Sequence, residues 1–338
     1  MRAVNVAVVG ATGAVGDEFL RLFELRKYPI KSLKLLASER SAGKKLKFAG
    51  KEYTVEKLTA ESFKGVEHAF FSAGGSISKE FAPAAAKAGA IIIDNTSAFR
   101  YEKEIPLVVP EINPEDAFKY GERRIIANPN CTTIVALMPT FPLHKKFGLK
   151  RAVMSSYQAI SGAGAQAMAE LEQQLRDWAA GRPMTVKIAP KQIAFNVIPR
   201  IDVVTDNGYT KEEMKFLWEG QKIMHHDSLR ATATCVRVPV LRSHSVSLNL
   251  EFEKPVTPDQ AREVLKAAPG VVVQDDPKAD VYPIPLERTM KNEVGVGRIR
   301  QDISVEGNKG LCLWAVGDQL MKGAALNAIQ IGELLLSR

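Results

Sequence analysis

The sequence contains 338 residues, of which 46% are hydrophobic and 25% are charged. This length is too great for one ordinary domain and suits two, and the composition is typical of a globular enzyme. No apolar run approaches the roughly 18 residues of a membrane span, so we predict no membrane segment. The net charge of +8 favours anionic partners, but basic residues are scattered among acidic ones, which argues against nucleic acid as a partner.

The sequence has three cysteines, and their positions, 131, 235 and 312, share no metal-ligand or disulfide spacing. The N-terminal segment is too short and wrongly flanked for a signal peptide. An odd number of cysteines without an export signal indicates a reducing compartment, where a free thiol survives. We therefore expect a cytoplasmic protein that holds no metal.

Short apolar segments alternate with helical ones through the first third of the chain. We predict strands at residues 4–9, 33–37, 66–71 and 91–94, and helices at 13–25 and 81–88. In the first helix Phe19, Leu22 and Phe23 lie on one face. Buried strands separated by helices at this spacing predict a parallel sheet with right-handed crossovers.

The pattern changes after about residue 130, where strands become longer and helices fewer. We predict helices at 165–180 and 211–224, strands at 232–239, 246–252, 294–301 and 311–316, and a final helix at 319–336. Long strands with few helices favour an antiparallel sheet that has helices on one face. The final helix follows this second region, and we expect it to return and pack on the first.

A glycine-rich turn, Gly10-Ala11-Thr12-Gly13-Ala14-Val15-Gly16, joins the first predicted strand to the first predicted helix. Its glycines permit a tight turn, close approach of the backbone to a phosphate, and close packing of helix on strand. The free amides at the helix start then face a pyrophosphate, helped by the helix dipole. The spacing is GxxGxxG rather than GxGxxG, so a glycine-rich turn without a ligand is the alternative. We predict that a dinucleotide contacts Gly10, Thr12, Gly13, Ala14, Val15 and Gly16.

The segment after the second predicted strand bears on which nicotinamide cofactor is used. An NAD enzyme usually has an acidic residue there for the ribose hydroxyls. Here the hydroxyls of Ser38 and Ser41, the guanidinium of Arg40 and nearby lysines suit the extra phosphate of NADP. Glu39 would favour NAD if it faced inward, and a basic solvated loop is the other alternative. We predict NADP and leave open how strictly it is preferred over NAD.

Together these patterns predict an α/β protein of two domains. Residues 1–130 form a Rossmann-type, NADP-binding domain with a parallel sheet, completed by a C-terminal helix at 319–338. Residues 131–318 form an α+β catalytic domain with a mostly antiparallel sheet.

Cys131 is the candidate nucleophile. It follows Pro129 and Asn130, which are residues that commonly start helices, and it precedes an apolar run. A helix N-terminus favours the thiolate and offers amides to an oxyanion beside it. A buried structural cysteine is the alternative, and it describes Cys235 and Cys312, which lie within predicted strands, better than it describes Cys131.

The five histidines provide one candidate for acid/base chemistry. His68 and His144 have apolar or basic neighbours. His225 and His226 end a predicted helix as an adjacent pair, which is poor metal-ligand spacing. His244 lies among polar residues just ahead of a strand and is the candidate. A purely structural histidine is the alternative.

A series of short motifs follows in order along almost the whole chain. They are residues 10–16, 37–44, Ser97-Ala98-Phe99-Arg100, 128–132, Ser156-Tyr157-Gln158-Ala159, Ser161-Gly162-Ala163-Gly164, Glu212-Glu213-Met214-Lys215, Cys235-Val236-Arg237-Val238-Pro239 and His244-Ser245. With these motifs in this order, the sequence resembles the aspartate-semialdehyde dehydrogenase family nearly from end to end.

The resemblance implies a reaction. In the family a thiolate, here Cys131, attacks L-aspartyl 4-phosphate and expels phosphate. NADPH delivers hydride to the resulting thioester, and the thiohemiacetal collapses to L-aspartate 4-semialdehyde, a step toward lysine (through diaminopimelate), methionine and threonine. His244 would be the acid/base, with a pKa near the working pH. Covalent catalysis divides one hard reduction into two easier steps.

The resemblance also implies substrate contacts. Gln158 would orient the acyl group, and Arg237 would clamp the α-carboxylate through two contacts. Arg100 and Lys215 would hold the phosphate, two cations for a dianion.

Glu212 would meet the substrate amino group, and Glu213 is the alternative residue for this role. Glu212 and Lys215 are one helical turn apart, so an ordinary ion pair on a helix surface is the other explanation for them. On the cofactor side, the resemblance implies that Ser161 and Gly162 approach the nicotinamide and that Gln319 contacts the cofactor.

Three other functions compete with this one. N-acetyl-γ-glutamyl-phosphate reductase shares the cofactor and the thioester chemistry but takes an acylated, uncharged amino group, whereas Glu212 suits a free ammonium. A non-catalytic NADP-binding relative would be expected to lose Cys131 or His244, and a thiol hydrolase without cofactor would leave the glycine turn unexplained. The family forms dimers or tetramers through its second domain. We therefore expect a dimerisation domain at 131–318, a homodimer or homotetramer, and a small-molecule substrate with inorganic phosphate.

Overall fold

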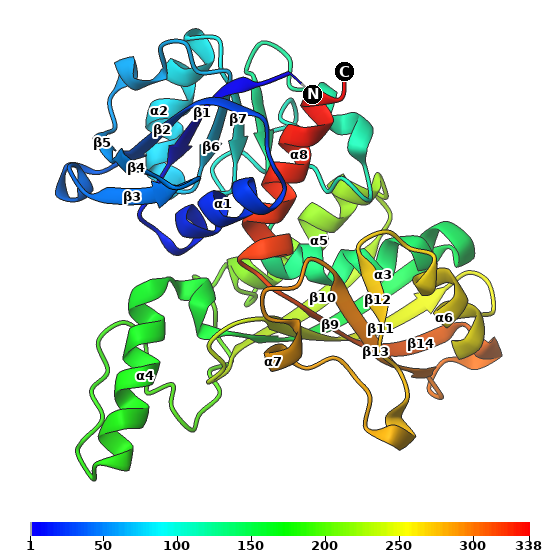
Figure 1. Ribbon diagram of the computed structural model, residues 1–338. Coiled ribbons are helices and arrows are strands. Elements are labelled where there is room, and N and C mark those ends of the chain that lie inside the picture. Colours follow the sequence, from blue (N-terminus) through cyan, green and yellow to red (C-terminus); the bar gives the residue numbers. More distant parts are fainter. Residues whose placement is uncertain (1) are drawn as a thin grey trace. The chain divides into compact units, whose positions relative to one another are not determined.

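The computed structural model describes residues 2–338, which form two compact units. Unit 1 comprises the chain up to Asn130 together with Gly323–Arg338, and unit 2 comprises Cys131–Lys322. Each unit is built around its own six-stranded sheet (Figure 1). Among residues 2–338, no helix combines the length and the apolar character needed to cross a membrane.

The sheet of unit 1, here called the N-terminal sheet, is parallel throughout. Its strands lie in the order β5-β2-β1-β6-β7-β8. Their bounds are β1 Val4–Val9, β2 Ile30–Ala37, β5 Glu56–Lys57, β6 His68–Phe71, β7 Ile91–Asp94 and β8 Ile125–Ala127. This is the Rossmann order: β2 and β5 extend the sheet on one side of β1, and β6, β7 and β8 extend it on the other. In such sheets ligands bind beyond the carboxyl ends of the strands, at the point where the strand order reverses. The predicted parallel sheet is confirmed.

Three helices cover the N-terminal sheet: α1 (Ala14–Leu25), α2 (Gly75–Lys87) and α8 (Leu326–Leu336). Helices α1 and α8 lie on one face and contact each other, and α2 lies on the other face (Figure 1). Phe19, Phe23 and Phe70 pack between α1 and the sheet, with ring centroids 5.2 to 5.9 Å apart.

The C-terminal helix begins later than the sequence predicted. Residues 319–336 were expected to form one helix, but Met321–Ala325 form a π-helical turn and α8 begins only at Leu326. The carboxylate of Asp318 accepts hydrogen bonds from the amides of Leu320 and Met321, at 2.9 and 3.3 Å. These are the contacts of an N-cap, so the helical segment starts just after Asp318, with a wide π-helical turn ahead of the regular α-helix.

Several short elements carry too weak a pattern to be predicted from the sequence. Strands β3 (Lys45–Phe48) and β4 (Lys51–Thr54) form a hairpin whose side chains are mostly exposed and rich in lysine. Helix α2 begins six residues earlier than the predicted start at residue 81.

The sheet of unit 2, here called the C-terminal sheet, has the strand order β10-β9-β11-β14-β13-β12. The bounds are β9 Leu149–Gln158, β10 Arg230–Arg237, β11 His244–Phe252, β12 Val271–Val273, β13 Val294–Gln301 and β14 Gly310–Gly317. The three central pairs are antiparallel, and the two outer pairs, β10 with β9 and β12 with β13, are parallel. The sheet is therefore mostly antiparallel, as predicted.

Helices α3 (Cys131–Phe147), α5 (Lys211–Met224) and α6 (Pro258–Lys266) pack against one face of the C-terminal sheet (Figure 1). Strand β11 shows why, since Val246, Leu248 and Leu250 are buried and alternate with the more exposed Ser247 and Asn249. The short helix α7 (Pro285–Arg288) contacts β14.

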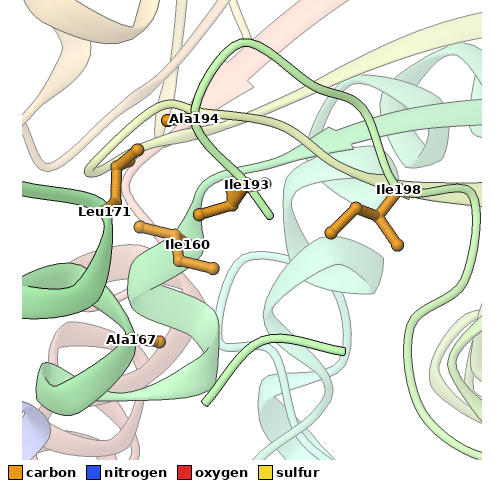
Figure 2. Close-up of a cluster of buried hydrophobic side chains, with 6 residues drawn as sticks. All are labelled: Ile160, Ala167, Leu171, Ile193, Ala194 and Ile198. Carbon is orange, nitrogen blue, oxygen red and sulfur yellow. The ribbon is translucent and has the colours of Figure 1, made fainter. Parts of the chain in front are cut away.

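Helix α4 (Ala165–Ala179) extends away from the C-terminal sheet, and a small apolar cluster holds its base (Figures 1 and 2). The cluster consists of Ile160, Ala167, Leu171, Ile193, Ala194 and Ile198. It joins α4 to the 3-10 turn η4 (Ile160–Ala163) and to the loop that carries residues 193–198.

In unit 1 a histidine is buried without charge. His68 on β6 is 4% exposed, and its Nδ1 lies 2.6 Å from the hydroxyl of Tyr28. Burial lowers the pKa of His68 to about 4. The unfolded chain binds a proton on this ring near pH 6.5, whereas the folded chain does not bind it until about pH 4. The free energy of unfolding therefore decreases as the pH falls through this window.

We predict that His68→Asn makes the free energy of unfolding less dependent on pH between 6.5 and 4. Asparagine keeps a polar atom for Tyr28 and cannot titrate, so the variant should lose about 3 kcal/mol less than the wild type across this window. Urea denaturation followed by circular dichroism measures the difference. His225→Asn, at an exposed helix end where asparagine suits the left-handed backbone, is the control. Equal slopes for His68→Asn and the wild type would contradict the assignment.

Candidate active site

The glycine turn of unit 1 has the shape that a dinucleotide requires. Gly10 has a φ of +90°, and a Cβ there would lie 2.7 Å from the carbonyl oxygen of Ser72. A Cβ on Gly16 would lie 2.5 Å from the carbonyl oxygens of Gly10 and Ala11. Only glycine fits at these two positions, and Gly13 precedes α1 without any side-chain cap on the helix. The backbone is therefore open to a phosphate at the N-terminus of α1, and the predicted residues fit NADP.

The direction of the Glu39 side chain, just after β2, bears on the choice between NAD and NADP. The Glu39 side chain is 80% exposed and forms an ion pair with Lys57, with 3.0 Å between Oε2 and Nζ. It therefore faces solvent. Ser38, Arg40 and the buried Ser41 form the turn beside it, directly after β2.

In unit 2, Cys131 is the first residue of α3, as the sequence predicted. Its side chain is partly exposed, and Sγ lies 3.9 Å from the hydroxyl of Thr132. A thiol at this position benefits from the helix dipole and from nearby amides. Cys235 and Cys312 are buried within β10 and β14, and burial raises the pKa of Cys235 to about 12. These two cysteines are structural, as expected.

The strand register of the C-terminal sheet brings three of the predicted residues together. Strands β9 and β10 run parallel with Gln158 opposite Arg237. Strand β11 runs antiparallel to β9, with Ser245 opposite Tyr157, so its first residue, His244, lies beside Gln158. Two strand ends and one strand start therefore meet at a single edge of the sheet.

His244 is fully buried, and its two ring nitrogens have different environments. Nδ1 accepts a hydrogen bond from the amide of Ala159 at 3.1 Å. Nε2 has no hydrogen-bond partner among residues 2–338. Because the Ala159 amide donates to Nδ1, the neutral ring carries its proton on Nε2. Burial and the positive charge of Arg237 lower the pKa of His244 to about 3. We expected the pKa of His244 to lie near the working pH, and this expectation is wrong for the ligand-free protein. The imidazole is shielded from water and lies beside the guanidinium of Arg237.

Arg237 lies at the end of β10, and its Nη1 donates to the carbonyl of Ala159 at 2.8 Å. Burial lowers its pKa, and the charges of Glu212 and Cys131 oppose that effect. These interactions show that the guanidinium lies within electrostatic range of both the thiol and the buried carboxylate.

Helix α5 contributes Glu212 and Lys215. Glu212 is 7% exposed, accepts from Nε2 of Gln158 at 3.1 Å, and pairs with Nζ of Lys215 at 2.8 Å. Glu213 is used differently, because it forms a capping box with Thr210. Of the two acids, only Glu212 therefore faces Gln158.

The turn η4 supplies Ser161 and Gly162. The side-chain amide of Gln319 bridges two segments: its Nε2 donates to the Ser161 hydroxyl, and its Oε1 accepts from the amide of Ser243 at 2.8 Å. A Cβ on Gly162 would lie 2.8 Å from Nη1 of Arg237 and 3.3 Å from Nε2 of His244. Gly162 therefore adjoins both Arg237 and His244, and Gln319 holds η4 next to the segment that precedes His244.

Arg100 belongs to unit 1, where it is buried and donates to the carbonyl of Asn95 at 2.8 Å. The side-chain nitrogen and oxygen of Asn95 are both buried and have no partner among residues 2–338. Sequence reasoning missed Asn95, although its place directly after β7, at the carboxyl edge of a parallel sheet, was a usable signal.

Two further contacts of the site, made by Ala159 and Asp202, were not predicted from the sequence. The backbone of Ala159 orients both His244 and Arg237, and no side-chain pattern reports a backbone contact. The carboxylate of Asp202 is a second partner of Lys215, at 3.2 Å, from a loop without regular structure.

Comparison with known proteins gives the family. The model of the semialdehyde dehydrogenase NAD binding domain matches residues 5–120, and that of the semialdehyde dehydrogenase dimerisation domain matches residues 141–322. The chain is 53% identical over 334 residues to aspartate-semialdehyde dehydrogenase of Aquifex aeolicus (strain VF5), covering 98% of each chain. The chain belongs to the aspartate-semialdehyde dehydrogenase family.

Further members of the aspartate-semialdehyde dehydrogenase family agree. The Bacillus subtilis (strain 168) enzyme is 48% identical, covering 99% of this chain and 98% of its own. The solved aspartate semialdehyde dehydrogenase II of Vibrio cholerae, complexed with ASA, has a TM-score of 0.96 and 44% identity, covering 100% of this chain and 99% of that one. The Candida albicans enzyme, solved with NADP, has a TM-score of 0.77 and 25% identity over 99% and 98%. These relatives do not favour the alternative reductase.

We predict that Gly162→Ala damages the site without unfolding the protein. The added methyl group would press on Arg237 and His244, so semialdehyde dehydrogenase activity, as kcat/KM, should fall by a factor of ~100. Gly162 is exposed and has no left-handed backbone, so the midpoint of thermal unfolding should stay within a few degrees of the wild type. Ala165→Ser, at the exposed start of α4, is the matched control. Full activity in Gly162→Ala would show that neither side chain needs its present position.

Proposed function

We propose that this protein reduces L-aspartyl 4-phosphate to L-aspartate 4-semialdehyde with NADPH, through a thioester on Cys131. The observation that carries the proposal is the meeting of Gln158, Arg237 and His244 at one edge of the C-terminal sheet, in a chain whose α3 begins with Cys131. The product supplies the biosynthesis of lysine, methionine and threonine. A catalytic thiol needs a reducing compartment, and we propose the cytoplasm.

The first step is acyl transfer. The Cys131 thiolate attacks the acyl carbon, a C–S bond forms, and the C–O bond to phosphate breaks so that phosphate leaves with its electron pair. The dipole of α3 and the guanidinium of Arg237 support the thiolate. NADPH, when bound, supplies the hydride that reduces the acyl group. The turn at residues 10–16, with Ser38, Arg40 and Ser41, would hold this cofactor, and Ser161, Gly162 and Gln319 would approach it.

The substrate contacts follow from charge. Arg237, which is half-buried, clamps the α-carboxylate, since a guanidinium partly shielded from water is a strong partner for a carboxylate. Glu212, which is buried and already pairs with one ammonium, takes the substrate amino group. Gln158 orients the acyl oxygen, and Lys215 and Arg100 bind the phosphate.

His244 acts first as a hydrogen-bond donor. Its Nε2–H, which has no partner among residues 2–338, faces Gly162 and can donate to the oxygen that becomes negative when the acyl carbon turns tetrahedral. Burial and the charge of Arg237 together lower the pKa of His244, and a substrate carboxylate on Arg237 would offset the second of these two causes.

The test is the reverse reaction, in which L-aspartate semialdehyde, NADP and phosphate should give reduced nicotinamide absorbance only when phosphate or arsenate is present. Cys131→Ala should lower this rate by a factor of ~10⁴ or more, because no other described thiol is placed to form the thioester. NADP affinity, measured by fluorescence titration, should stay unchanged.

Other outcomes of this assay would redirect the assignment. Signal with N-acetyl-glutamate semialdehyde alone would move the protein to the alternative reductase. Silence with both aldehydes despite NADP binding would indicate a non-catalytic relative. Normal turnover in Cys131→Ala would reject the thioester.

We also propose that two copies associate through the open face of the C-terminal sheet, opposite α3 and α5. The matched dimerisation domain covers this sheet. On this face Tyr157 is 40% exposed and packs against Trp314, with ring centroids 5.3 Å apart. A hollow of about 340 Å³ lies beside them, with Ser247, Tyr282 and Trp314 among its lining residues. Aromatic and arginine side chains are enriched at protein interfaces, and the half-buried Tyr282 and Trp314 line this hollow together with Arg298 and Arg300.

We predict that Ser247→Arg converts the dimer to a monomer, because it places a charged side chain at the centre of this face. Sedimentation equilibrium measures the mass, with Ser247→Ala as the matched control that should remain dimeric. A dimer of unchanged stability in Ser247→Arg would locate the interface elsewhere, and a wild-type mass of four chains would indicate a tetramer.

A further inference from the structure

The loop that carries Asp202 is fixed at both ends. On one side, the amide and carbonyl of Ile198 form two hydrogen bonds of 2.9 Å with the backbone of Arg237. Ile198 also belongs to the apolar cluster at the base of α4 (Figure 2). On the other side, the amide of Lys211, the first residue of α5, donates to the carbonyl of Val203 at 2.8 Å. The position of Asp202 is therefore set by the same elements that position Arg237 and Lys215.

Asp202 itself has an unusual backbone. Its φ is +70°, which few residues other than glycine adopt, although aspartate and asparagine tolerate it. Its Oδ1 accepts from the amide of Val203 at 2.8 Å, which leaves Oδ2 directed to Nζ of Lys215 at 3.2 Å. Asp202 and Arg237 also both line a cavity of about 310 Å³. The carboxylate therefore faces the space beside the substrate-binding arginine.

The two carboxylates on Lys215 are not equivalent. Glu212 lies 2.8 Å from Nζ, its side chain is 7% exposed, and Gln158 braces its other oxygen. Asp202 lies 3.2 Å from Nζ, and its side chain is 35% exposed. Glu212, which is nearer and more buried, is the stable partner of Lys215, because a buried ion pair is costly to break. The more exposed ion pair with Asp202 costs little to break.

We infer that Asp202 is an internal competitor for phosphate, which holds Lys215 in the ligand-free protein and gives it up when a phosphate group binds. The inference rests on the proposed function, in which Lys215 binds the phosphate. Once a phosphate dianion reaches Nζ, the Asp202 carboxylate lies within a few ångströms of like charge and repels it. Asp202 thus lowers the affinity of the site for phosphate while Glu212 keeps the ammonium in place.

Such a competitor has a use in this reaction. The acyl phosphate is held by its carboxylate and amino group as well as by its phosphate, so it can tolerate a weaker phosphate contact. Free phosphate, the first product, has only the cations to hold it. A carboxylate that competes for Lys215 weakens the phosphate contact of both, but the substrate stays bound through its other contacts, whereas free phosphate departs faster after the thioester forms.

The test is Asp202→Asn, which removes the charge but suits the same left-handed backbone and so should fold normally. In the reverse reaction the KM for phosphate should fall three- to tenfold, with the KM for the aldehyde and for NADP unchanged. In the forward reaction phosphate should become a stronger product inhibitor by the same factor. Asp206→Asn, an exposed acid on the same loop, is the matched control and should leave both values unchanged.

An unchanged or raised KM for phosphate in Asp202→Asn would overturn the inference, since a residue that only positions Lys215 would weaken phosphate binding when removed. Titration calorimetry with inorganic phosphate on the ligand-free protein keeps this test separate from the proposed function. If the wild type shows no phosphate-dependent turnover, the proposed function fails, and calorimetry still decides about Asp202. Tighter phosphate binding in Asp202→Asn than in the wild type would support the inference, and equal or weaker binding would reject it.

Discussion

The backbone of Ala159 is the point on which the site in unit 2 depends. Its amide donates to Nδ1 of His244, and its carbonyl accepts from the guanidinium of Arg237. One residue therefore sets the tautomer of the histidine and the direction of the arginine. Ala159 can do so because it directly follows β9, whose neighbours on either side are the strands that carry these two side chains. Backbone groups at strand ends are rigid, which is what a site that orients a reactive group requires.

This arrangement also determines the electrostatics. His244 is buried and Arg237 is half-buried beside it, and this desolvation lowers the pKa of each. Glu212 partly compensates for both groups. The site therefore has a positive charge that a substrate carboxylate would neutralise. Next to it lies a neutral N–H that would donate a hydrogen bond to a developing oxyanion. The lowered pKa keeps the His244 ring neutral across the whole range near and below neutral pH, where an ordinary histidine would become protonated.

Much of the fold could be predicted because its signals are local. Helix α5 and strand β7 fall at the predicted residues, since the period of their apolar residues is clear. Cys131 was placed at a helix start by Pro129 and Asn130. Other features could not be predicted because they depend on contacts between distant segments, such as the ion pair of Glu39 with Lys57. The desolvation of His244 is another such feature, since the spacing of residues in a sequence does not show which side chains become buried. The roles of the site residues rested on resemblance, because an exposed arginine and a buried one look alike in a sequence.

Buried polar atoms without a hydrogen-bond partner reduce the stability of this fold. A buried polar atom usually has a hydrogen-bond partner, and leaving one without costs about 1–3 kcal/mol. Nε2 of His244 in unit 2 and the Asn95 side chain in unit 1 have no partner among residues 2–338. These atoms are almost completely covered by the folded chain, so the chain itself leaves this cost uncompensated. A ligand that supplies the missing partners binds only the folded protein, and its binding energy stabilises that state. Substrate and cofactor would thus complete hydrogen bonding that the chain leaves unfinished.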